Sequence, residues 1–221
     1  MKRVNKLKQA ALILDGEINL KFIEEDWDLP LFDLICCTDG AYLTLKNSQI
    51  IHHNLNAIIG DLDSLGDSSN IDKKIEIIHK KDQNSTDFEK ALNYLFDKGI
   101  KKIIVYGASG LSSDHFLGNI STAIAWKNKI DLEFRDAYGS LYFIDKNFEI
   151  SGVKGKTISL IPFFEATDVY YEGLMYPLNG ETLSFGQKIG TRNIAVEDSI
   201  KISYGSGCLL FYIENKRSKR G

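Results

Sequence analysis

The stretch Ile58–Leu65, IIGDLDSL, runs an apolar segment into a glycine and then places two aspartates two residues apart. Two like charges about 4 Å apart repel by roughly 4 kcal/mol at an effective dielectric near 20. A fold tolerates this pair where a positive group lies between the carboxylates, or where both point into water. What the pair does therefore depends first on the kind of sheet that contains it.

Other short apolar runs share the character of the segment before Gly60, and helix-like stretches separate them. Continuous apolar strands of this kind fit a sheet covered on both faces, which is typical of a parallel α/β arrangement. The runs lie at 10–14, 34–37, 57–59, 75–78, 103–106 and 132–134.

Two of the intervening helices are clearly marked, at 85–99 and 113–129. We expect Thr86 to cap the first, because Glu89 follows three residues later as in a capping box. Ser113 or Asp114 is expected to cap the second.

The pattern changes near residue 138, where apolar and polar residues begin to alternate between turn signals. This alternation predicts antiparallel sheet, most simply a small sandwich. We therefore expect a parallel-sheet, Rossmann-like α/β domain over 1–137 and a smaller antiparallel β-sandwich domain over 138–221.

Composition narrows the classes of function. The net charge is −3, from 27 Lys and Arg against 30 Asp and Glu, so no basic field favours nucleic acid. No apolar run approaches the ~18 residues of a membrane span, and the apolar part of the N-terminal segment is too short for a signal peptide. The three cysteines are expected to be buried, reduced thiols of a cytoplasmic protein.

Aspartates or glycines follow most of the predicted parallel strands. In an open parallel sheet these positions share the carboxyl-end edge, where ligands bind. Each alone is also an ordinary turn, but together they predict a functional rim. The segments are Asp15-Gly16, Asp39-Gly40, Gly60–Asp63, Asp82-Gln83 and Gly107–Gly110.

If the chain stays extended past Gly60, Asp61 and Asp63 point to the same side while Leu62 faces the core. Paired carboxylates suit Mg²⁺, which takes one or two of them together with substrate phosphates. The alternative is a turn with solvated acids. Asp87 and Lys90, on one face at a helix start, suggest metal and phosphate binding, or else a surface ion pair worth ~0.3–0.5 kcal/mol.

The segment GASGLSSDHFLGN, residues 107–119, puts two glycines before a helix. We expect Gly107 and Gly110 to let the backbone approach a ligand, with the following helix N-terminus as an anion site. The segment lacks the Lys-Ser/Thr ending of a Walker loop. A lone histidine such as His115 is more often structural than catalytic.

Taken in order, these motifs resemble the thiamin pyrophosphokinase family. The resemblance rests on Asp39–Ala41, Gly60–Ser64, Asp82–Leu92 and the segment 107–119, and it continues through GLMYPLNGETL, GTRN and GSGCLLFYI near the C-terminus. It implies an α/β nucleotide domain, a β-sandwich domain and a homodimer with sites at the subunit interface. It also implies Mg²⁺-dependent transfer of diphosphate from ATP to the hydroxyl of thiamine, giving AMP and thiamine diphosphate.

The resemblance also implies roles for individual residues. Metal and phosphate would be bound by Asp39, Asp61, Asp63 and Asp87, and substrate or phosphates would be contacted by Gln83, Thr86 and Lys90. Gly107, Gly110 and Asp114 would line the nucleotide side, and Thr191, Arg192 and Asn193 would help to form the thiamine pocket. Of these, Asp61, Asp63, Asp87 and Lys90 would carry the catalysis.

Three departures from the family pattern keep other functions open. Leu111 and Ser112 stand where the family has a glycine and an arginine, Arg192 replaces a serine, and the usual Asp-Gly-Gly-Ala-Asn reads Asp39–Leu43 here. The alternatives are a pyrophosphokinase for another hydroxyalkyl heterocycle, such as a pterin, and an inactive nucleotide- or thiamine-binding module.

Overall fold

The computed structural model describes residues 8–27, 31–65, 71–82 and 84–217. The chain divides into two compact units, Met1–Asp136 and Ala137–Gly221.

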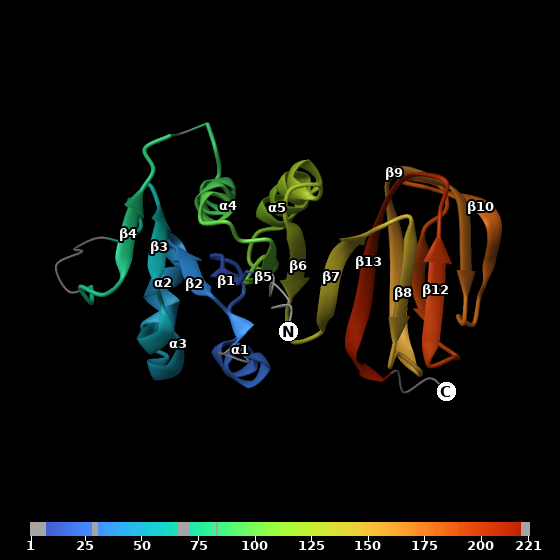
Figure 1. Ribbon diagram of the computed structural model, residues 1–221, viewed down its shortest axis with the longest axis horizontal. Helices are drawn as coiled ribbons and strands as arrows, with labels where there is room; N and C mark the ends of the chain where they lie inside the picture. Colours follow the sequence, from blue (N-terminus) through green and yellow to red (C-terminus); the bar gives the residue numbers. More distant parts are fainter. Residues whose placement is uncertain (1–7, 28–30, 66–70, 83, 218–221) are drawn as a thin grey trace, which may run out of the picture. The chain divides into compact units, whose positions relative to one another are not determined.

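The first unit contains a parallel sheet in the order β4-β3-β2-β1-β5-β6 (Figure 1). The predicted parallel arrangement is confirmed. The predicted strand at 75–78 is not buried on both faces, because β4 is the edge strand and its residues are mostly exposed. The strands are β1 (Gln9–Ile13), β2 (Leu34–Thr38), β3 (Ala57–Gly60), β4 (Glu76–His79), β5 (Lys102–Tyr106) and β6 (Asp131–Arg135).

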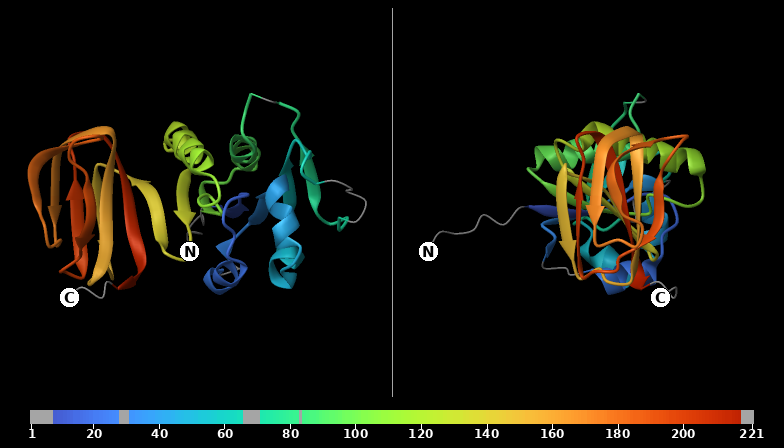
Figure 2. Two further views of the ribbon diagram at one scale, coloured as in Figure 1. Left: turned by 180° about the vertical axis from the view of Figure 1, so that it is seen from behind. Right: turned by 90° about the vertical axis from the view of Figure 1, so that its right-hand side faces the viewer.

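Five helices cover the two faces of this sheet in the described residues of the first unit. Figures 1 and 2 show α4 (Asp87–Asp97) and α5 (Ser113–Trp126) on one face. The other face carries α1 (Leu20–Asp26), α2 (Asp39–Leu45) and α3 (Gln49–Asn54). The two helices predicted from the sequence are therefore present, and three short ones were not predicted.

Of the two N-terminal caps predicted for these helices, one is present in the structure and the other is not. The Thr86 hydroxyl accepts the Glu89 N–H at 3.2 Å, which confirms the predicted cap of α4. The predicted cap of α5 is wrong: Ser112 is the N-cap, without a side-chain cap bond, and Asp114 lies in the first turn. The Ser112 hydroxyl bonds instead to the Asp114 carboxylate.

The second unit is an antiparallel sheet in the order β7-β13-β9-β12-β8, with β10 and β11 also paired to β9. The strands are β7 (Gly139–Ile144), β8 (Asn147–Ser151), β9 (Lys156–Glu172), β10 (Leu178–Ser184), β11 (Gly190–Ile194), β12 (Ser199–Ser203) and β13 (Ser206–Arg217).

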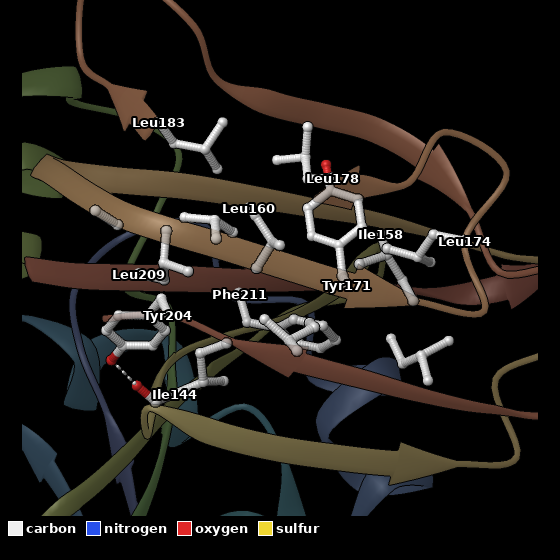
Figure 3. Packing of buried hydrophobic residues seen from close by; sticks show 14 of the residues in the cluster. Ile144, Ile158, Leu160, Tyr171, Leu174, Leu178, Leu183, Tyr204, Leu209 and Phe211 are labelled. Carbon is white, nitrogen blue, oxygen red and sulfur yellow. Dashed lines mark hydrogen bonds between the residues drawn. The ribbon is translucent and has the colours of Figure 1, made fainter. Parts of the chain in front are cut away.

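The core of the second unit comes from inward-facing residues of these strands. Ile158 and Leu160 of β9 pack with Leu209 and Phe211 of β13, all at most 1 % exposed (Figure 3). The hydroxyl of buried Tyr204 donates to the Ile144 carbonyl at 2.8 Å, which pairs two polar atoms inside this core.

Cys36, Cys37 and Cys208 are buried, and none of them is in a disulfide, which confirms the expectation of buried thiols. Within the described segments, none of the helices has the length and apolar character that a membrane-spanning helix needs.

We expect Tyr204→Phe to lower the free energy of unfolding by about 1–2 kcal/mol, because the Ile144 carbonyl loses its buried donor. Burial, followed by the charges of Cys208 and Asp145, raises the pKa of Tyr204 to about 12. The unfolded-state pKa is about 10, so this stabilisation is complete below pH ~10 and is lost as the pH rises through about 12.

Urea unfolding as a function of pH measures this effect. The variant should lack the decline between pH 10 and 12 that Tyr204 contributes. Tyr176→Phe is the matched control, because Tyr176 is 66 % exposed and the change should leave stability unaltered. A Tyr204 variant that behaves like the Tyr176 variant would contradict the assignment.

Candidate active site

The carboxyl ends of β1, β2 and β5 meet the starts of α4 and α5 around a pocket of about 650 Å³ within the first unit. Predicted site residues that line it are Asp39, Thr86, Asp87, Gly107, Gly110 and Asp114. Other lining residues come from the predicted rim segments: Asp15, Gly16, Gly40 and Ala108. The lining residues that had not been assigned to the site from the sequence are Leu14, Thr38, Ser64, Phe88, Leu111, Ser112, His115, Gly118 and Asn119.

Asp39 begins α2 at the end of β2 and is 2 % exposed. One carboxylate oxygen accepts the Gly40 N–H and the other accepts the Leu62 N–H, both at 2.9 Å. Burial raises the pKa of Asp39, and the neighbouring Asp87 charge raises it further. This acid is therefore bound to backbone on both oxygens.

The Asp61–Asp63 segment is a turn rather than an extension of β3. The strand ends at Gly60, Leu62 has a left-handed φ of 70°, and Asp63 N–H donates to Asp61 Oδ1 at 3.3 Å. The expectation of an extended chain was wrong, because a left-handed residue reverses the chain direction. Leu62 does pack against the core, as predicted, and Asp63 is exposed.

Lys90 connects two acids from different elements. Its ammonium lies 2.9 Å from Asp87 Oδ1 and 3.7 Å from Asp61 Oδ2, and its side chain is only 5 % exposed. Burial acts to lower the pKa of Lys90, but the hydrogen bond and charge of Asp87, with the Asp61 charge, raise it overall. The site therefore keeps one buried positive charge between two carboxylates.

The two glycine-bearing loops beside the pocket are joined by backbone hydrogen bonds. Gly16 N–H donates to the Gly107 carbonyl, and Glu17 N–H to the Ser109 carbonyl, each at 2.8 Å. A Cβ on Gly16 would lie 2.3 Å from the Gly107 oxygen, and one on Gly110 would lie 2.5 Å from the Glu17 Cβ. These glycines thus permit close contact between the loops, in addition to the predicted approach to a ligand.

The start of α5 forms another wall of the pocket. The hydrogen bond from Ser112, followed by the His115 N–H, lowers the pKa of Asp114. Asn119 Nδ2 donates to the Ala108 carbonyl at 2.8 Å and so holds the β5–α5 loop. Leu111 is 85 % exposed and left-handed, with φ 53°, a conformation that glycine adopts more readily than a residue with a side chain.

The predicted thiamine segment belongs to β11 in the second unit. Asn193 is 5 % exposed and is bonded to the Tyr176 backbone through both ends of its amide. Arg192 has φ 57°, and its exposed guanidinium lies 3.4 Å from Glu214 Oε1. Thr191 is exposed. Asn193 therefore shapes this segment from inside, and the other two side chains lie on its surface.

Two predicted rim residues have a different status. Asp82 accepts bonds from Asn84 and Ser85 in its own loop and does not line the pocket. Gln83 lies outside the described residues. Asp15 was predicted to lie on the rim from the Asp-Gly signal after β1, and it lines the pocket, whereas the pocket positions of His115 and Asn119 needed the helix geometry.

The acidic cluster fits a divalent cation that arrives with phosphates. Among the described residues, no three His, Cys, Asp or Glu side chains are close enough to enclose a metal ion by themselves. Mg²⁺ commonly takes one or two carboxylates and completes its shell with water and substrate phosphates. The carboxylates of Asp61 and Asp87, both beside Lys90, match that requirement, and Asp63 lies in the same turn as Asp61.

We expect Gly16→Ala to lower the free energy of unfolding by about 1–3 kcal/mol, because the new methyl group would overlap backbone atoms of the neighbouring loop. Gly118→Ala is the matched control: nothing lies within 4 Å of a Cβ there, so it should stabilise α5 by up to about 1 kcal/mol. Urea unfolding followed by circular dichroism measures both. Shifts of the same sign and size would rule out the close loop contact.

Comparisons with known proteins agree along the chain. Residues 30–134 match the family model described as thiamin pyrophosphokinase, catalytic domain, and residues 143–209 match thiamin pyrophosphokinase, vitamin B1 binding domain. Thiamine pyrophosphokinase of Bacillus subtilis (strain 168) is 28 % identical over 180 residues, which is 78 % of this chain and 83 % of that protein.

Thiamine pyrophosphokinase 1 of Oryza sativa subsp. japonica is 28 % identical over 167 residues, covering 67 % of this chain and 62 % of that protein. The crystal structure of thiamine pyrophosphokinase from Bacillus subtilis superposes with a TM-score of 0.80 at 23 % identity, covering 94 % of this chain and 99 % of the other, which shows a shared fold. With its two domain matches together spanning well over half of its length, the chain belongs to the thiamin pyrophosphokinase family.

Proposed function

We propose that this chain is a thiamine diphosphokinase, which transfers diphosphate from ATP to the hydroxyl of thiamine in a Mg²⁺-dependent reaction. The thiamine oxygen bonds to the β-phosphorus of ATP, and the bond from that phosphorus to the oxygen shared with the α-phosphate breaks. The hydroxyl proton is released, and the products are thiamine diphosphate and AMP.

The observation that supports this proposal most directly is the Asp87–Lys90–Asp61 group. It lies at the start of α4 within the segment that matches the family's catalytic domain. Asp87 also lines the pocket formed by the glycine-bearing loops. Phosphoryl transfer depends mostly on positioning and on offsetting charge, and this group combines oxygen ligands with a buried ammonium.

Each part of the first unit has a task in this proposal. Asp61, Asp63 and Asp87 would hold Mg²⁺, which offsets the charge of the polyphosphate when bound. Lys90 stabilises the transferring group, and a carboxylate that is not engaged by the cation orients the thiamine hydroxyl. The backbones at Gly107 and Gly110, with Asp114 and the start of α5, receive the nucleotide.

The remaining assignments follow from family membership. Thr86 and Gln83 are proposed substrate or phosphate contacts, and Thr191, Arg192 and Asn193 are proposed to form the thiamine side. The parallel unit would be a Rossmann-like nucleotide domain, and the antiparallel unit a β-sandwich that also makes the homodimer contact. A cytoplasmic location is supported by the three buried cysteines, none of which is in a disulfide.

The alternatives left open by the sequence are not favoured. A pterin pyrophosphokinase or an inactive binding module would not account for matches to both the catalytic and the vitamin B1 binding domains, or for curated relatives named thiamine pyrophosphokinase. An assay of AMP release with thiamine, ATP and Mg²⁺ tests the proposal. Release that does not depend on thiamine would overturn it.

We expect Asp63→Asn to lower kcat by at least about 100-fold, because a preorganised charge at the reacting phosphates is lost. The side chain is exposed, so circular dichroism should be unchanged. Asp97→Asn, at the far end of α4 from Asp87, is the charge-matched control and should remain active. An active Asp63→Asn enzyme would exclude this residue from the chemistry.

Removal of Mg²⁺ by a chelator should weaken ATP binding at least about tenfold, because uncompensated carboxylates then face the polyphosphate. Isothermal titration with ATP, with and without the cation, measures the change. Asp87→Asn should reduce the dependence of affinity on Mg²⁺. If the affinity for ATP were the same in both conditions, the acids would have no part in binding the cation.

A further inference from the structure

The geometry of the Asp61–Asp63 turn depends on the residue between the acids. Leu62 is left-handed, with φ 70°, a conformation that disfavours a non-glycine residue by roughly 1–2 kcal/mol. A strained residue of this kind persists only where its surroundings hold it. If Leu62 relaxed to an ordinary conformation, both flanking carboxylates would turn to new directions.

Asp39 provides the polar part of that support. Its Oδ2 accepts the Leu62 N–H at 2.9 Å, across the space between two neighbouring strand ends. The other oxygen of the same carboxylate, Oδ1, accepts the Gly40 N–H at 2.9 Å. The acid is 2 % exposed, so these charge-assisted bonds form away from water, where they are strong.

Gly60 makes this arrangement sterically possible. A Cβ on Gly60 would lie 2.6 Å from the Asp39 Cγ and 2.7 Å from its Oδ1, closer than side-chain atoms can approach. The Asp39 carboxylate therefore lies directly against the Gly60 backbone and reaches the Leu62 amide over it. Leu62 is fastened on its other side by packing against the core of the first unit.

We propose that Asp39 is a positioning residue, which acts on catalysis by holding the left-handed turn at Leu62 and not as a direct ligand of metal or substrate. The inference rests on the proposed function, because it assigns a role within the same site. It replaces the metal-ligand role that the family resemblance implied for Asp39. The cation ligands then come from the turn and from α4.

The test is a double-mutant cycle between Asp39→Asn and Leu62→Gly. In Asp39→Asn the amide nitrogen faces one of the two N–H donors, so one bond is lost. Glycine adopts positive φ without strain, so a turn with glycine at position 62 needs no support from residue 39. We expect Asp39→Asn to lower kcat at least tenfold with an unchanged KM for thiamine, and Leu62→Gly to restore most of that loss in the double variant.

Two readouts do not require activity. Hydrogen exchange at the residue 62 amide should accelerate at least tenfold in Asp39→Asn. Binding of Mn²⁺ with ATP, followed by electron paramagnetic resonance without thiamine, should weaken less in Asp39→Asn than in Asp61→Asn. Both measurements test the role of Asp39 even if the wild-type chain releases no AMP. A lack of AMP release would overturn the proposed function and not the positioning role.

Asp33→Asn is the matched control, because Asp33 Oδ2 also accepts a backbone N–H, that of Gln9 at 2.9 Å, but away from the turn. Leu62→Gly should not rescue any defect of this variant. The proposal is overturned if Leu62→Gly fails to improve Asp39→Asn and Mn²⁺ binding falls as far as in Asp61→Asn. If Asp39→Asn does not fold, recovery of folding in the double variant supports the proposal, and continued failure overturns it.

Discussion

The ion group around Lys90 is the interaction on which the rest of the site depends. Several carboxylates gather at one edge of a parallel sheet, and pairs at about 4 Å would repel by roughly 4 kcal/mol at an effective dielectric near 20. The buried ammonium lies 2.9 Å from Asp87 and 3.7 Å from Asp61. It offsets the negative charge of both carboxylates and so makes the acidic edge compatible with a folded chain.

Glycines at the strand ends give the acids room to approach one another. The Asp15 carboxylate lies where a side chain on Gly40 would be, and the Asp39 carboxylate lies where one on Gly60 would be. Gly16 and Gly107 likewise lack side chains where the backbones of two loops come into contact. The pocket wall therefore contains close contacts that a side chain at these glycines would prevent. The Asp15 and Asp39 carboxylates each lie against the backbone at the end of the next strand along the chain.

Much of this arrangement could be predicted from local patterns. Continuous apolar runs identified the parallel strands, and Thr86 with Glu89 identified the start of α4. The three short helices were not predicted, because six or seven residues contain too little periodicity to stand out. The cap of α5 was misplaced because Asp114 bonds to Ser112, a choice made by the loop that follows β5.

The sequence by itself determined that the sheet of the first unit is parallel, that the strands of the second unit alternate apolar and polar residues, and that acids follow the strand ends. These follow from hydrophobic period and from turn chemistry, which are local properties. Only the tertiary structure decided that Leu62 is left-handed, that Asp39 is bound to backbone on both oxygens and that Lys90 joins Asp61 to Asp87. The physical reason is that the contacts of Asp39 with Leu62 and of Lys90 with Asp61 join segments far apart in the chain, whose closeness arises only when the strands align.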